Sequence, residues 1–308
     1  MRCLVTGGAG FLGSHIVDRL LKEGWQVRVI DNLSTGRLEN LQHKSIEVIV
    51  GDLKNMSDCM KATENIDVIF HYAADPRVEI SSANPRLHFD NNILATFNIL
   101  EAMRKNDVEN IVFASSSSVY GEPERTPVSE DAPLKPISVY GASKVACEAL
   151  IHAYSSLYGI KAVCLRYANI VGPRMKHGVV YDFIMKLKKK PHILEILGDG
   201  NQVRSFLHVE DAVEATLLAF KKAPNYFNIY NVGNIDYITI REVAEIVVEE
   251  LGLKKVKFKF KGVSWSGDIK RIILDISKIM SLGWKPKLNS KEAVRKSVKE
   301  ILNELDRI

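Results

Sequence analysis

The sequence predicts an α/β protein built on a doubly wound parallel sheet, and three observations predict it. The chain has 308 residues with 46% apolar composition, enough for one large core and a second, smaller lobe. Short apolar runs alternate with amphipathic stretches through the first half. A glycine-rich segment, residues 6–13, joins the first apolar run to the first amphipathic stretch.

The elements of the first half follow from this alternation. Strands are expected at residues 3–5, 27–30, 46–50, 68–71, 111–115 and 162–166. Helices are expected at residues 11–22, 85–105 and 139–158. Strands that alternate with helices pair in parallel through right-handed crossovers, which gives the doubly wound sheet.

A smaller lobe is expected after Asn169, where the alternation becomes irregular. The segment 206–232 again has the pattern of a helix followed by a strand, so it is expected to return to the main sheet. We therefore assign residues 1–168, together with 206–232, to the first domain. Residues 169–205 and 233–308 are assigned to a discontinuous C-terminal α/β lobe that binds substrate.

Charge and apolar patterning exclude several classes of partner. The net charge is only +5, and Lys188 to Lys190 lie at the expected end of a helix, where a solvated face is the simpler interpretation. No apolar stretch approaches the ~20 residues that a membrane span needs, and the first strand starts too close to Met1 for a signal peptide. We expect a cytoplasmic protein without nucleic-acid or membrane partners.

The cysteines and histidines do not predict a metal site. Cys3, Cys59, Cys147 and Cys164 have neither metal-ligand nor C-x-x-C spacing and lie among apolar residues, as buried thiols do in a reducing compartment. The histidines that could be considered also lie far apart and have no carboxylate or cysteine at ligand spacing: His71, His177 and His208. No metal is expected.

The glycine-rich segment predicts a dinucleotide site. Gly7 permits a tight turn, Gly10 lets the backbone approach a pyrophosphate, and Gly13 lets helix and strand pack closely. The unpaired N–H groups at the start of the helix then face the anion. This context, strand then turn then helix, is typical of the Rossmann type of doubly wound sheet. A turn without a ligand is the alternative.

An acidic residue at the end of the second strand points to NAD. Asp31 follows Gly10 by about twenty residues, where a carboxylate accepts hydrogen bonds from the adenosine ribose hydroxyls. A 2'-phosphate would be repelled there, although Arg37 is close enough in sequence to leave NADP open. A capping role for Asp31 is the other alternative.

A tyrosine and a lysine at helical spacing predict proton transfer. Tyr140 and Lys144 lie on one face at the start of the helix expected at 139–158. The ammonium can lower the pKa of the phenol, which ordinarily lies near ~10. Ser115 to Ser118 follow the strand residues 111–113 and so lie at the carboxyl edge of the sheet, where ligands of parallel sheets bind. The alternative for Tyr140 and Lys144 is an exposed pair on the helix surface without a catalytic role. The alternative for the serines is a polar end of the strand.

Together these residues resemble the extended short-chain dehydrogenase/reductase family, in its branch of NAD-dependent nucleotide-sugar epimerases and dehydratases. The resemblance covers nearly the whole chain, including the segments at 71–74, 91–96, 165–169, 172–174 and 198–204. It implies Ser116, Tyr140 and Lys144 as catalytic residues. It implies these cofactor-binding residues: Gly7, Gly10, Phe11, Leu12, Gly13, Asp31, Asn32, Asp52, Leu53, Ala73, Ala74, Asn92, Tyr140, Lys144 and Tyr167. Substrate would be bound by Ser116, Tyr140, Asn169, Arg204 and Arg271.

The two residues after Ser116 distinguish the reactions of this family. Its dehydratases carry Asp-Glu there, whereas this chain has Ser117 and Ser118, so elimination lacks its proton carriers. The resemblance therefore implies a 4-epimerase that interconverts UDP-galactose and UDP-glucose through a transient 4-keto sugar and bound NADH. NAD is regenerated in each cycle.

Three departures from the family pattern affect the substrate side. Trp265 stands where related epimerases often have a diphosphate-binding arginine, which Arg271 could replace. Ser205 replaces a frequent aspartate, and Ala95 a frequent glycine. An epimerase or reductase for another nucleotide sugar, such as a uronic acid or an N-acetylhexosamine, and a non-catalytic NAD-binding regulator stay open as alternatives.

The resemblance also implies an oligomeric state. The helices expected at 85–105 and 139–158 resemble the pair through which family members dimerise as a four-helix bundle. A homodimer is expected, with burial of those apolar residues within the monomer as the alternative.

Overall fold

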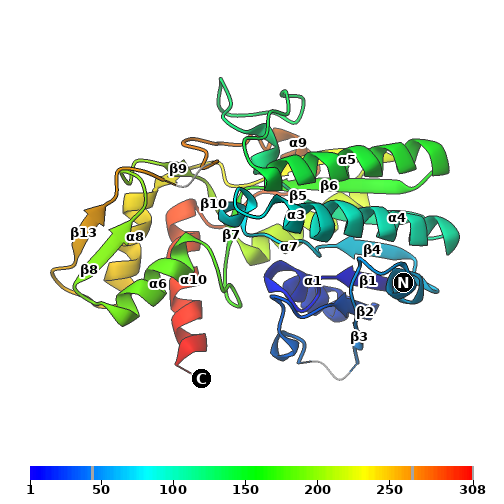
Figure 1. Cartoon of the computed structure of the whole chain (residues 1–308), viewed down its shortest axis with the longest axis horizontal. Helices are drawn as coiled ribbons and strands as arrows, with labels where there is room; N and C mark the ends of the chain where they lie inside the picture. The colour runs from blue at the N-terminus through cyan, green and yellow to red at the C-terminus, as the bar shows by residue number, and fades with distance from the viewer. Residues whose placement is uncertain (43–44, 265–266, 307–308) are drawn as a thin grey trace.

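The computed structural model describes residues 1–42, 45–264 and 267–306. A sheet with helices on both faces occupies one end of the molecule, and a group of helices with short strands occupies the other (Figure 1). The Rossmann-type architecture predicted from the sequence is confirmed.

Seven parallel strands form the central sheet, in the order β11-β6-β5-β4-β1-β2-β3. Their bounds are β1 Arg2–Thr6, β2 Gln26–Asp31, β3 Glu47–Val50, β4 Val68–His71, β5 Asn110–Ser116, β6 Lys161–Tyr167 and β11 Phe227–Val232. The strand order reverses between β1 and β4, which opens a crevice at their carboxyl ends. Strand β11 pairs in parallel along β6.

Two layers of helices bury the two faces of the sheet. Helices α1 (Phe11–Lys22) and α7 (Val209–Lys222) pack on one face through side chains such as Ile16, Leu20 and Val213. Helices α2 (Met56–Thr63), α4 (Ala95–Lys105) and α5 (Val139–Tyr158) cover the other, with Ile99, Met103 and Ile151 in its core. The sequence pattern had not predicted α2.

The prediction of a single α-helix at 85–105 is wrong in detail, because the segment is divided into three parts. These parts are α3 (Pro85–His88), a π-helical segment (Phe89–Leu94) and α4. The π segment surrounds the buried Asn92, whose backbone carbonyl accepts a hydrogen bond from the Thr96 hydroxyl at 2.6 Å. Such π turns interrupt helices where a side chain must be placed for another purpose, and apolar periodicity alone does not reveal them.

The smaller group of elements follows β6. It contains β7 (Asn169–Val171), α6 (Val179–Lys189), β8 (Ile193–Ile196), β9 (Val203–Arg204), β10 (Phe206–His208), β12 (Ile238–Thr239), α8 (Ile240–Glu250), β13 (Lys257–Phe260) and α10 (Ser290–Leu305). The short helix α9 (Ser277–Met280) packs instead against β11 of the central sheet (Figure 1). The remaining short turns are η1 (Leu38–Asn40), η2 (Val78–Ser81) and η4 (Ser117–Tyr120). Helices α8 and α10 each begin with a capping box, which satisfies their first free N–H groups. Lys188 to Lys190 are exposed at the end of α6, as predicted.

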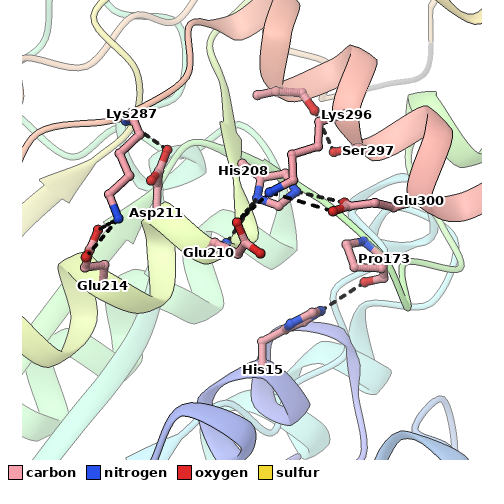
Figure 2. Close-up of polar contacts among 11 residues, drawn as sticks. His15, Pro173, His208, Glu210, Asp211, Glu214, Lys287, Lys296, Ser297 and Glu300 are labelled. Carbon is pink, nitrogen blue, oxygen red and sulfur yellow. Dashed lines mark hydrogen bonds and ion pairs between the residues drawn. The ribbon is translucent and has the colours of Figure 1, made fainter.

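Helix α10 is held to the sheet domain by polar contacts at its junction with α7 and α1 (Figure 2). His208, buried at the start of α7, contacts the Glu300 carboxylate at 2.9 Å, and Lys296 pairs with Glu210 at 2.5 Å. His15 on α1 contacts the carbonyl of Pro173 at 3.1 Å. Burial lowers the pKa of His15 to about 4, so its ring is neutral at neutral pH.

The same junction fixes the segment that follows β7. The Arg174 guanidinium pairs with Asp18 on α1 at 2.7 Å, and its backbone N–H donates to Glu304 on α10 at 2.9 Å. Arg174 has a left-handed backbone, with φ of 66°. Because these contacts come from both ends of the molecule, the segment from Pro173 onward is held between α1 and the C-terminal helix.

No helix in the described residues combines the length and the apolar character that crossing a bilayer requires.

Candidate active site at the carboxyl edge of the sheet

The glycine turn lies where β1 meets α1. Gly7 has φ of +65°, and a Cβ on it would lie 2.7 Å from the backbone nitrogen of Ala73. A Cβ on Gly13 would lie 2.2 Å from the carbonyl oxygen of Gly7. Helix α1 begins after Gly10 without a side-chain cap, so its first N–H groups are left for a ligand. A side chain at Gly7 or Gly13 would collide with the backbone of neighbouring segments, so the close packing of the turn requires glycine there. The free N–H groups at the start of α1 fit a pyrophosphate.

The acidic residue of the second strand borders the same cavity. The Asp31 carboxylate accepts hydrogen bonds from the backbone N–H groups of Ala9 at 3.0 Å and Leu33 at 2.8 Å. Burial raises its pKa above the usual value of an aspartate, although both hydrogen bonds oppose this. The Asn32 amide donates to the Asp52 carboxylate at 3.3 Å, which joins the ends of β2 and β3. The arrangement leaves carboxylate oxygens available to ribose hydroxyls.

The serine, tyrosine and lysine expected to react meet at the carboxyl end of β5. Helix α5 is capped by Ser138, whose hydroxyl accepts from the N–H of Gly141 at 3.0 Å, and this places Tyr140 in its first turn. Lys144 follows one turn later and donates to the carbonyl of Ala114 at 2.8 Å. Its ammonium lies 5.8 Å from the centre of the Tyr140 ring. Ser116 ends β5 and is hydrogen-bonded to the Tyr140 hydroxyl.

Burial shifts the pKa values of this pair in opposite directions. It raises the pKa of Tyr140 to about 12, against the hydrogen bond with Ser116, and it lowers the pKa of Lys144 to about 8. Both shifts have the same cause, since burial disfavours the charged form of each group. Without ligands, Tyr140 is therefore protonated at neutral pH, and a further positive charge in the cavity would favour its phenolate.

Asn92 supports the site without bordering the cavity. Its side-chain oxygen accepts from the N–H of Asp75 at 2.9 Å, and its amide donates to the Ser143 hydroxyl at 2.8 Å. Ser143 in turn donates to the carbonyl of Tyr140 at 2.7 Å. The structure thus places Asn92 behind Tyr140, where it positions the first turn of α5. The neighbouring Asn91 borders the cavity instead.

Tyr167 borders the cavity from the end of β6. Its hydroxyl is within 2.9 Å of that of Tyr72 and within 2.5 Å of the Thr216 hydroxyl. Burial raises the pKa of Tyr167 well above its usual value. This side chain therefore supplies a neutral wall between the sheet and α7, not a second base.

Arg204, predicted to bind substrate, borders the cavity but is already paired. Its guanidinium contacts the Asp268 carboxylate at 2.7 Å, and both side chains are largely buried. Asn169 borders the cavity at the start of β7. Arg271 is not brought into the cavity, because its guanidinium lies over the Tyr237 ring at 5.4 Å. Trp265, singled out in the sequence, lies outside the described residues.

One cavity of about 720 Å³ connects the glycine turn with the smaller group of elements. Of the predicted site residues, the following border it: Gly7, Gly10, Phe11, Leu12, Gly13, Asp31, Asn32, Asp52, Leu53, Ala73, Ala74, Ser116, Tyr140, Lys144, Tyr167, Asn169 and Arg204. Charged or ionisable residues that the sequence had not indicated for this site also border it: Glu79, Lys176, His177, Asp182 and Lys186. No spacing rule marks them, since they lie on the irregular turn η2, in the segment before α6 and on α6 itself.

The cysteines are free and buried, as predicted, and lie in the sheet and in the helices that cover it. Within residues 1–42, 45–264 and 267–306, His, Cys, Asp and Glu side chains form no group of three or more suited to a metal ion.

The sheet, the glycine turn and the serine, tyrosine and lysine set define a dinucleotide-dependent enzyme of the Rossmann class. The chain belongs to the NAD dependent epimerase/dehydratase family, whose model matches residues 3–233. This membership agrees with the predicted NAD cofactor, for which the glycine turn and Asp31 are suited.

Individual relatives are similar over almost their whole length. The chain is 41% identical to a putative UDP-glucose 4-epimerase of Methanocaldococcus jannaschii, over 97% of this chain and 98% of that protein. A crystal structure of a UDP-galactose 4-epimerase has a TM-score of 0.92 and 47% identity, and covers 99% of this chain and 100% of its own. The UDP-glucose 4-epimerase of Thermus thermophilus in complex with NAD has a TM-score of 0.90 and 38% identity, with coverage of 97% and 98%.

A buried ion pair joins the elements that carry Ser116, Tyr140 and Lys144. Arg166 on β6 pairs with Glu148 on α5 at 2.7 Å, and both side chains are almost fully buried. Glu148 also accepts from the Ser115 hydroxyl at 2.5 Å, and Arg166 donates to the Tyr120 hydroxyl at 2.9 Å. The pair therefore joins α5, the serine segment and β6.

Replacing Glu148 by glutamine should be strongly destabilising. Glu148→Gln keeps the size of the side chain but leaves the Arg166 charge buried without its counter-charge, which should lower the free energy of unfolding by about 3–5 kcal/mol. Urea unfolding measures this. Arg86→Gln is the matched control, because its pair with Asp90 lies at the surface and should contribute at most about 1 kcal/mol. Equal effects of the two substitutions would contradict the role given to the buried pair.

Proposed function

We propose that this protein is an NAD-dependent UDP-glucose 4-epimerase that interconverts UDP-galactose and UDP-glucose. The observation that carries the proposal is the convergence of Ser116, Tyr140 and Lys144 on one cavity that also contains the glycine turn. The names of the related enzymes support it. At the positions after Ser116 stand Ser117 and Ser118, without the carboxylates that an elimination would need.

The residues of the site have separate tasks in the proposed reaction. Tyr140 takes the proton of the sugar 4-hydroxyl and later returns it to the reduced sugar. NAD, held by the glycine turn and Asp31, would supply the redox chemistry of the reaction, as acceptor of the hydride from C4 and as its donor to the opposite face of the sugar. Lys144 is fixed by the Ala114 carbonyl close to the Tyr140 ring, where its charge favours the phenolate form.

The substrate side is proposed from Asn169 and Arg204. Both border the cavity that also holds the reacting residues and the glycine turn. Arg204 carries the positive charge that a diphosphate needs. Its guanidinium would then interact with both Asp268 and the diphosphate. The sugar is turned within the cavity between the two hydride steps, for which a volume of about 720 Å³ leaves room.

Conversion of UDP-galactose without added NAD tests the proposal. The wild-type protein should form UDP-glucose, because the cofactor is regenerated in each cycle and stays bound. Tyr140→Phe removes only the hydroxyl and should lower kcat by at least about a hundredfold. The products are separated and quantified by chromatography, and NAD is quantified after heat denaturation of both proteins. A wild type that binds NAD but converts no UDP-galactose, even with added NAD, would refute the proposed substrate.

We further propose a homodimer formed through α4 and α5. Both helices expose large apolar side chains: Phe97 is 40% exposed on α4, and Leu157 is 72% exposed near the end of α5. Apolar side chains that water would otherwise surround are stabilised by burial against a second copy. We also propose a cytoplasmic location, which the four buried free thiols support. A role in galactose metabolism follows from the proposed substrate.

A charge on α4 should separate the proposed dimer. Phe97→Glu places a carboxylate in the expected interface and should give a monomer in light scattering coupled to size-exclusion chromatography. Met280→Glu is the control, because Met280 on α9 is also 40% exposed but lies outside the proposed interface. A wild-type monomer, or a Phe97→Glu dimer, would contradict the assignment.

A further inference from the structure

We infer that Ser118 is a positioning residue of the epimerase reaction: its hydroxyl orients the proton of Ser116 toward the reacting oxygen of the sugar. The inference rests on the proposed function and adds a residue to its machinery. It starts from the hydrogen bonds that Ser116 already makes within the protein.

Both acceptor positions of Ser116 are filled by one residue. The Ser118 backbone N–H donates to the Ser116 hydroxyl oxygen at 3.2 Å, and the Ser118 hydroxyl donates to the same oxygen at 2.8 Å. A hydroxyl group has two acceptor lone pairs and one donor proton. The remaining capacity of Ser116 is therefore its own proton, which is left for Tyr140 or for a ligand in the cavity that Ser116 borders.

The backbone holds Ser118 firmly in this place. Its carbonyl oxygen lies 2.5 Å from where a Cβ of Gly141 would be, so the segment packs directly on the first turn of α5 beside Tyr140. The same carbonyl accepts from the N–H of Gly121 at 3.4 Å. Ser118 also lines a small cavity of about 130 Å³ that Ser116 and Asn169 border as well. The hydroxyl thus lies at the edge of the substrate region.

A fixed donor matters because the sugar oxygen changes its character during the reaction. As a hydroxyl, the oxygen can give a proton to Tyr140 and accept a hydrogen bond from Ser116. As the carbonyl of the keto sugar, it can only accept. A Ser116 proton that is always directed outward stabilises the keto state, and a hydroxyl that accepts hydrogen bonds is also a stronger donor. Without the Ser118 hydroxyl, Ser116 can rotate and act as acceptor instead.

The test compares Ser118→Ala and Ser118→Thr with Ser117→Ala in the full-length protein. Ser117 is the matched control, because its side chain has no hydrogen bond among the described residues although it borders the same small cavity. Ser118→Ala should lower kcat for UDP-galactose by about threefold to tenfold with KM little changed. Ser118→Thr, which keeps the hydroxyl, should restore it, and Ser117→Ala should behave as wild type.

A second readout separates positioning from a general structural effect. At saturating substrate, the fraction of bound cofactor in the reduced form reports the population of the keto sugar, and near-ultraviolet absorbance measures it. Ser118→Ala should lower this fraction while its thermal unfolding stays that of Ser117→Ala.

Two results would overturn the inference alone. One is an active wild type with equal kcat in Ser118→Ala and Ser117→Ala, and the other is a loss in Ser118→Ala that threonine does not restore. A wild-type protein that converts no UDP-galactose would overturn the proposed function and this inference with it.

Discussion

The buried ion pair between Glu148 and Arg166 is the interaction on which the site depends. Glu148 lies one turn after Lys144 on α5 and two turns after Tyr140, and it also accepts from Ser115, the neighbour of Ser116. One carboxylate thus sets the distance between the helix that carries the phenol and the strand that carries the serine. A buried pair of this kind is costly to desolvate, so its value lies in fixing one arrangement of α5 on β5 and β6.

The glycine turn imposes the second constraint, at the other end of the cavity. The close approach of Gly13 to Gly7 holds α1 against β1, and the uncapped start of α1 then faces the carboxyl ends of β1 and β4. The contact of α1 with the segment after β7, shown in Figure 2, extends this geometry to the substrate side. Helix α1 therefore joins the glycine turn to the segment that follows β7.

The sequence predicted those parts of the structure that depend on local patterns. Apolar runs located the strands from β1 to β6, and the spacing of Tyr140 and Lys144 placed both on one face of α5. The glycine motif and Asp31 located the dinucleotide end, because their roles follow from backbone geometry and from position after a strand. NAD as cofactor followed from the same residues.

Features that arise from tertiary packing could not be predicted in this way. The π segment around Asn92 exists because the Asn92 side chain bonds Asp75 and Ser143, which are distant in sequence. Arg271 was expected at the diphosphate, but it stacks on Tyr237, whereas Glu79 and His177 border the cavity through irregular turns. The hydrogen bonds from Ser118 to Ser116 likewise depend on the tight turn η4 and leave no mark in the spacing of the serines.

The measurement that tests the central claim most directly is the fate of the hydrogen at C4. UDP-galactose labelled with deuterium at C4 is converted in ordinary water, and the label in UDP-glucose is quantified by mass spectrometry. An enzyme that removes this hydrogen and returns it within a closed cavity keeps the label at C4, and unlabelled substrate takes up no deuterium from heavy water. Loss of the label to solvent would contradict the account, because it would mean that C4 exchanges a proton with a base instead of a hydride with the cofactor.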